Sequence, residues 1–120
     1  MTSYEYLNDL RFIDRAVEID RRELKKLETI KVKSEEFERY KQSIEDDLNS
    51  LYALKNEAMD LINQVRPSEL ALILRSHYLY SQRWEDVARA MYYSVENIYV
   101  LRREAILAFD RIYNKATLNE

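Results

Sequence analysis

The chain has 120 residues, of which 47% are hydrophobic and 34% charged, and its formal net charge of −3 excludes a general nucleic-acid binder held by bulk positive charge. It contains no glycine, no cysteine and one proline, Pro67, a composition that favours an all-α fold and excludes disulfides and thiolate metal sites. A single histidine, His77, is too few for a metal site built on nitrogen ligands, so we expect neither a metal nor a cofactor.

No stretch approaches the roughly 20 apolar residues that a membrane-spanning helix needs, and the N-terminal residues lack the basic and apolar regions of a signal peptide. We therefore expect a cytoplasmic protein without membrane contact. Residues 1–66 hold 12 basic and 15 acidic side chains, whereas residues 67–120 hold seven of each kind. Any contact with DNA must then come from a local basic patch.

The first predicted helix runs from about Tyr4 to Ile30 and is amphipathic. Its apolar stripe consists of Leu10, Ile13, Val17, Leu24 and Leu27. The residues from Lys31 to Ser34 interrupt this stripe, and Ser34 followed by acidic residues is typical of a helix N-cap. A second helix is predicted from there to about Val65.

The second predicted helix carries apolar residues at seven-residue spacing, which is typical of coiled coils. These residues are Phe37, Ile44, Leu51, Ala58 and Val65. A helix of this length, about 48 Å at about 1.5 Å per residue, is too long to bury its stripe against the C-terminal half alone. The short connection favours an antiparallel hairpin with the first helix, and pairing with a second copy of the chain is the alternative. Residues 1–66 are thus expected to form a helical hairpin or oligomerisation arm.

Residues 67–120 are expected to form a three-helix domain that contains a helix-turn-helix. Pro67 can open the first of these helices, because proline is tolerated in a first turn. The residues from Tyr80 to Arg83 read as a loop. A short helix is predicted from Trp84 to Met91 and a longer one from Val95 to about Tyr113.

The apolar residues of the last two predicted helices have the spacing of a helix-turn-helix. Ala88 is the small residue where the helices meet, and Val87 precedes it. Ile98 and Leu101 then hold the second helix at a defined crossing angle. This spacing predicts the fold of the segment, and it does not by itself predict DNA binding.

The turn between these helices has one expected cap and one departure from the usual pattern. Ser94 is the expected N-cap of the second helix. Tyr92 stands where such motifs often carry glycine, and a tyrosine with positive φ is strained. We therefore expect a turn that is longer than three residues or differently shaped.

The segments Arg83–Ala88, Tyr93–Tyr99 and Arg102–Ala105 together resemble sigma-factor region four. They are more closely similar to the small regulators of phages of Gram-positive bacteria, of the ArpU and RinA kind, which show a tryptophan-led helix followed by a Tyr-Ser turn. The resemblance covers roughly the last 50 residues. It implies a DNA-binding protein of a bacterial host cell whose second helix enters the major groove, with a role in the control of late or packaging genes.

The exposed face of the last predicted helix carries the candidate readers of DNA bases. These are Glu96, Asn97, Tyr99, Val100 and Arg103, with Arg102 at the edge of the face. Asn97 can pair with adenine, Arg103 can form a fork with guanine, and Val100 can meet a thymine methyl group. The alternative interpretation is an ordinary solvated helix face.

Contacts to DNA phosphates are expected at Arg83 and Arg89, and Ser94 can add another through its hydroxyl or backbone N–H. Trp84 can stack on a nucleotide, but the interpretation that we favour is a core residue. For His77 we favour a packed side chain with its polar edge satisfied over a switch or a ligand. No side chain has a recognisable catalytic base or oxyanion partner, so an enzyme is not expected.

The leading hypothesis is a sequence-specific regulator of transcription that binds double-stranded DNA. Its N-terminal helices would form a homodimer or higher oligomer, or contact RNA polymerase. The alternative is a helical interaction module that binds RNA polymerase or another host protein, which the negative net charge favours. A third possibility is the small subunit of a phage packaging terminase, which also combines a helix-turn-helix with helical oligomerisation segments.

Overall fold

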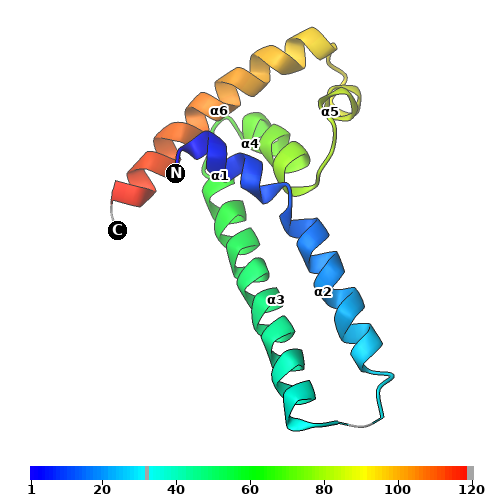
Figure 1. The fold of residues 1–120 in the computed structure, drawn as a ribbon. Helices are drawn as coiled ribbons and strands as arrows, with labels where there is room; N and C mark the ends of the chain where they lie inside the picture. Colours follow the sequence, from blue (N-terminus) through cyan, green and yellow to red (C-terminus); the bar gives the residue numbers. More distant parts are fainter. Residues whose placement is uncertain (32, 119–120) are drawn as a thin grey trace.

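The computed structural model describes residues 1–31 and 33–118, and within these ranges it is all-helical and contains no strand. The helices are α1 (Ser3–Leu10), α2 (Ile13–Leu27), α3 (Glu35–Ile62), α4 (Ser68–Leu74), the π-helical segment η1 (Arg75–Leu79), α5 (Trp84–Ala90) and α6 (Val95–Leu118) (Figure 1). The expectation of an all-α protein is confirmed.

The N-terminal segment is not the single helix expected over residues 4–30, because the helix is interrupted at Arg11 and Phe12. α1 buries Tyr6 and Leu7 in a core formed with the C-terminal helices, whereas α2 lies along α3 (Figure 1). The two pieces therefore pack against different partners. The apolar stripe continues across the interruption in the sequence, so its periodicity does not show where one piece ends.

α2 and α3 lie side by side and run antiparallel, joined at the end of the molecule farthest from the other helices (Figure 1). Ser34 caps α3 as expected, since its Oγ accepts the backbone N–H of Phe37 at 3.1 Å. The buried side chains of this pair include Leu27, Ile44 and Leu48. Val32, which belongs to the expected interruption between the helices, lies outside the described residues.

The main hydrophobic core lies where the C-terminal helices meet α1 and the last turns of α3. Its fully buried members include Leu7, Ile62, Ile73, Leu74, Tyr78, Ile98 and Phe109. This core takes side chains from both sides of the domain boundary expected after residue 66. The division into residues 1–66 and 67–120 stays a prediction, and the structure adds that α1 packs against α6 and η1.

The molecule is elongated, with extents of 56 × 36 × 19 Å. Its Cα radius of gyration is 18.0 Å. A compact domain of this length has a radius of gyration of about 14 Å. The difference arises because the α2–α3 pair projects away from the core (Figure 1). None of the described helices is both long and apolar enough to cross a membrane.

Candidate nucleic-acid interface

The turn between α5 and α6 comprises four residues, Met91 to Ser94, and closes α5 with a left-handed residue. The backbone N–H of Tyr93 donates to the carbonyl of Ala88 at 2.9 Å, and that of Tyr92 donates to Arg89 at 3.2 Å. This pair of bonds is the Schellman arrangement, whose central residue is most often glycine. Here Tyr92 takes that position with φ 61°. The turn is thus longer than three residues, which is one of the two expected departures. Tyr92 nevertheless has a positive φ, which is strained for a tyrosine.

Two polar contacts hold the turn in place. Ser94 is the N-cap of α6, as expected, because its Oγ accepts the backbone N–H of Asn97 at 3.1 Å. The hydroxyl of Tyr93 donates to the carboxylate of Glu69 on α4. The turn is therefore held by a hydrogen bond to α6, which follows it, and by another to α4.

The two faces of α6 differ in exposure over its first three turns. Ile98 and Ala105 are fully buried, while Leu101 is half-buried against the core. The opposite face carries Glu96, Asn97, Val100 and Arg103, all exposed to solvent. Tyr99 lies at the side of the helix with 40% of its surface exposed. The structure thus brings the candidate base readers together on one accessible surface.

Arg102 is set apart from this surface. Its guanidinium lies over the ring of Trp84, 5.2 Å from the centroid, and the side chain is half-buried. Trp84 is only 9% exposed and stacks on His77 with the ring centroids 3.9 Å apart. Trp84 is therefore a core residue, as we expected. Arg102 contacts that core, so it is poorly placed to reach a base edge in its present conformation.

His77 is buried, and its ring has a hydrogen-bond partner. Nδ1 donates to the carbonyl oxygen of Gln82 at 2.7 Å. Burial lowers the pKa of His77 below its usual 6.5, and the bond to Gln82 offsets this only in part. The ring is thus neutral at pH 7, in agreement with the packed histidine expected from the sequence.

The two candidate phosphate contacts share one carboxylate. Nε of Arg83 lies 3.3 Å from Oδ2 of Asp86, and Nη1 of Arg89 lies 3.8 Å from Oδ1. Both arginine side chains remain largely exposed, so each guanidinium can still reach a phosphate. Asp86 is not among the site residues expected from the sequence, although its spacing of three residues from each arginine is the local signal of such pairs on a helix.

Helix α1 and the residue after it line this region, although none of their side chains is among the site residues expected from the sequence. A groove of about 460 Å³ between α1 and α6 is lined by Tyr4, Tyr99, Arg102, Arg103, Ile106 and Leu107. A second, adjoining pocket of about 310 Å³ includes Tyr4, Asn8 and Arg11 together with Arg83, Trp84 and Arg102. No local pattern in the sequence indicates this proximity, because α1 lies more than 70 residues before α5 and α6.

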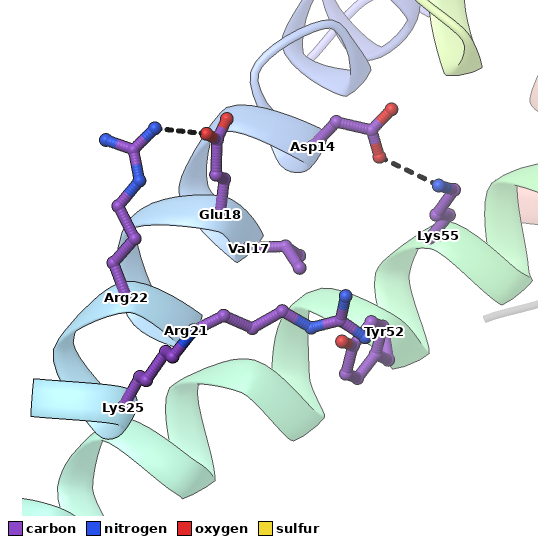
Figure 2. Close-up of a pocket in the computed structure, with 8 residues that line it drawn as sticks. All are labelled: Asp14, Val17, Glu18, Arg21, Arg22, Lys25, Tyr52 and Lys55. Atoms are coloured by element: carbon purple, nitrogen blue, oxygen red, sulfur yellow. Dashed lines mark hydrogen bonds and ion pairs between the residues drawn. The ribbon is translucent and has the colours of Figure 1, made fainter.

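A separate groove of about 480 Å³ lies between α2 and α3, with residues from both helices around it (Figure 2). Its two acidic side chains are paired: Asp14 with Lys55 at 2.8 Å, and Glu18 with Arg22. The guanidinium of Arg21 lies 5.7 Å from the ring centroid of Tyr52. This groove is remote from the candidate base readers, because it lies on the projecting pair of helices.

Within residues 1–31 and 33–118, no three histidine, cysteine or carboxylate side chains gather in a way that can hold a metal ion. Comparison of the chain with protein-family models, with curated proteins and with solved structures finds no match.

Proposed function

We propose that this protein is a sequence-specific regulator that binds double-stranded DNA through α5, the turn and α6, used as a helix-turn-helix of the sigma region-four kind. The supporting observation is the accessible face of α6, with Asn97, Val100 and Arg103 exposed while Ile98 and Ala105 hold the helix in the core. A helix exposed along one face in this way fits the width of the major groove.

The exposed side chains offer the chemistry that base recognition needs. Asn97 pairs with adenine through its amide, and Arg103 forms a bidentate contact with guanine O6 and N7. Val100 supplies an apolar contact for a thymine methyl group, and Glu96 and Tyr99 extend the same face.

Contacts to the DNA backbone come from the residues around the reading face. Arg83 and Arg89 contact phosphates and fix the position of α6 in the groove. Ser94, the N-cap of α6, adds a phosphate contact through its hydroxyl or backbone N–H. These contacts supply affinity and register, and the exposed face of α6 supplies the sequence preference.

Charge limits the affinity of a single chain. Residues 83–118 carry six basic and five acidic side chains, a net charge of +1. Binding by one copy is therefore weak, because few positive charges remain to neutralise phosphates. Pairing of two copies through the α2–α3 hairpin, or contact of the hairpin with RNA polymerase, would supply the remaining affinity. A regulator of the phage type suggested by the sequence resemblance would act in this way.

The first test is the substitution Arg103→Ala. A cognate site is obtained by selecting bound sequences from random duplex DNA, and affinity is then measured by fluorescence anisotropy. We expect the variant to bind that site more weakly by about 1–3 kcal/mol and to lose preference at one base position. Arg111→Ala, which removes the same charge from an exposed position two turns further along α6, is the matched control. Equal affinities of wild type and Arg103→Ala on every sequence would refute base reading by α6.

A second candidate function is an interaction module that binds a protein, and the projecting hairpin favours it. Residues 11–33 hold eight basic and five acidic side chains, a net of +3, whereas residues 34–62 hold three and eight, a net of −5. Such separated charges suit an interface with complementary charge on the partner. The two functions are distinguished by salt-dependent DNA binding, which the regulator requires and the interaction module lacks.

A further inference from the structure

Three arginines from different parts of the chain line the pocket of about 310 Å³ that adjoins the groove between α1 and α6. Arg11 comes from the junction of α1 and α2, Arg83 from the start of α5, and Arg102 from α6. Glu85 is the acidic residue among those lining the pocket. His77, which also lines the pocket, is neutral, so three arginines and one glutamate give the lining side chains a formal net charge of +2.

Two of these guanidiniums lack an acidic partner within the chain. Among the described residues, no carboxylate oxygen lies within 4.0 Å of Arg11 or Arg102. Arg102 is half-buried over the tryptophan ring, where its charge is less screened than at an open surface. Converging cations without a counter-charge repel one another, and a bound anion would relieve that repulsion.

The charges of Arg11 and Arg102 also act on two neighbouring titratable groups. The pKa of His77 is lowered first by burial and then also by the positive charges of Arg11 and Arg102. The pKa of the Tyr4 hydroxyl is lowered first by its hydrogen bond with Asn8, and further by the same two arginines. In both groups the larger cause is burial or a hydrogen bond, and the two arginines add to it in the direction expected of converging positive charges, which favour an anionic ligand.

The chemistry of the pocket favours a phosphate group over other anions. Guanidinium groups present planar pairs of N–H donors that match the oxygens of phosphate and form charge-assisted bonds. The pocket volume of about 310 Å³ leaves room for one such group and its attached sugar. Tyr4, which also lines the pocket and is 46% exposed, offers an aromatic surface for the apolar side of a sugar.

The position of the pocket beside α6 indicates which molecule would supply the phosphate group. Arg102 and Arg103 are adjacent in the helix, so their side chains point about 100° apart. Arg102 is directed into the pocket, while Arg103 lies on the exposed face proposed to read bases. The pocket therefore flanks the reading face, where the backbone of a bound duplex would pass.

We propose that Arg11, Arg83 and Arg102 form a binding pocket for a phosphate group of the DNA backbone, with the N-terminal helix contributing Arg11. This inference rests on the proposed function, because the phosphate belongs to the duplex in which α6 is docked. It assigns α1 a direct part in DNA binding beyond its packing in the core. A free phosphate compound is the other source of the same chemistry.

The test measures binding of duplex DNA to the full chain by fluorescence anisotropy over a range of salt concentrations. We expect Arg11→Gln to weaken binding roughly three- to tenfold on all sequences alike, and to reduce the slope of log K against log salt by about one. Arg11 is exposed, so the variant should keep its fold, which its Tm checks. Arg39→Gln removes the same charge from an exposed position on the hairpin and should change neither quantity.

The possible results of this test distinguish a failure of the pocket proposal from a failure of the proposed function. If the wild type selects a DNA sequence while Arg11→Gln keeps its affinity and slope, the pocket is refuted and the proposed function stands. Equal losses in Arg11→Gln and Arg39→Gln indicate a general charge effect, and they also refute the pocket.

If the wild type binds no DNA, the proposed function fails and a second measurement decides on the pocket. Trp84 is the only tryptophan in the chain, so its fluorescence reports on the pocket during titration with inorganic pyrophosphate. A saturable change that Arg11→Gln shifts at least roughly threefold to higher concentration supports a phosphate site for a free compound. No saturable change overturns the inference.

Discussion

Tyr92 holds a left-handed backbone conformation at the turn between α5 and α6, with φ 61° and 96% of its side chain exposed. A non-glycine residue in this region costs roughly 1–2 kcal/mol, whereas glycine adopts it freely but loses roughly 0.5–1 kcal/mol through the entropy of the unfolded chain. The side chain contributes little packing, so the backbone term decides the effect of a substitution here.

We therefore expect Tyr92→Gly to raise the free energy of unfolding by up to about 1 kcal/mol. Tyr92→Val should lower it, because a β-branched residue tolerates positive φ poorly. Urea denaturation followed by circular dichroism measures both. A less stable Tyr92→Gly protein would contradict this account of the turn. DNA affinity serves as a control for the position of α6, which the glycine should leave unchanged.

At the scale of elements, the α2–α3 pair brings two acidic residues, Asp20 and Asp47, close to each other. Oδ2 of Asp20 is buried and has no hydrogen-bond donor, and its neighbour across the pair is the carboxyl group of Asp47. Two neighbouring carboxylates repel each other when both are ionised, which favours the protonated form of one of them. Sharing a proton with Asp47 raises the pKa of Asp20 from 3.8 to about 6, with burial as the second cause.

The raised pKa makes the stability of the hairpin depend on pH. The protonated form of Asp20 is favoured by folding, so its contribution is present below about pH 4 and is lost as the pH rises through about 6. Asp20→Asn should remove this dependence and raise stability at pH 7 by about 1 kcal/mol or less, since the pair is partly open to solvent. Thermal unfolding between pH 4 and 8 measures the change. Asp46→Asn, on the exposed side of α3, is the matched control.

The surroundings of helix α6 also change along its length. Its first turns are open to solvent on the candidate reading face, whereas α1 covers part of its later turns. Ser3 Oγ donates to Asp110 of α6 at 2.5 Å, and the ring of Tyr6 stacks on Phe109 with the centroids 6.0 Å apart. The first turns of α6 are thus a candidate recognition element, and its later turns are part of the core. The packing of the later turns fixes the orientation of the first ones.

At the scale of the whole molecule, the N-terminal helix completes the core of the C-terminal helices. Leu7 is fully buried and belongs to the same cluster as Ala105 and Phe109. We expect Leu7→Ala to lower the free energy of unfolding by roughly 2–5 kcal/mol, because it leaves a cavity in a packed core. Leu107→Ala, at a position that is 58% exposed on α6, should change stability by less than about 0.5 kcal/mol.

Trp84 fluorescence is the readout for this prediction, because Trp84 is the only tryptophan in the chain and lies in α5, among the C-terminal helices. The transition seen by Trp84 should shift in Leu7→Ala even though the substitution lies in α1. An unchanged Trp84 transition would show that residues 67–120 fold independently of α1, as the boundary expected after residue 66 requires.

The sequence by itself determined the features that depend on neighbours within a few residues. Ser34 and Ser94 are helix caps because a short polar side chain reaches a backbone N–H three positions further on. Apolar spacing placed Trp84 and Ile98 in the core, since helical periodicity sets which side chains share a face. These local relations are sufficient to predict an all-α chain and the helices on either side of the turn.

Only the tertiary structure decided which elements meet. It separated α1 from α2 at Arg11, directed Arg102 over Trp84 and placed Arg11 beside both. The reason is physical: these contacts join residues far apart in the chain, and their geometry depends on how several apolar faces are buried at once. Periodicity shows that a face is apolar, but only the packed core selects the partner that covers it.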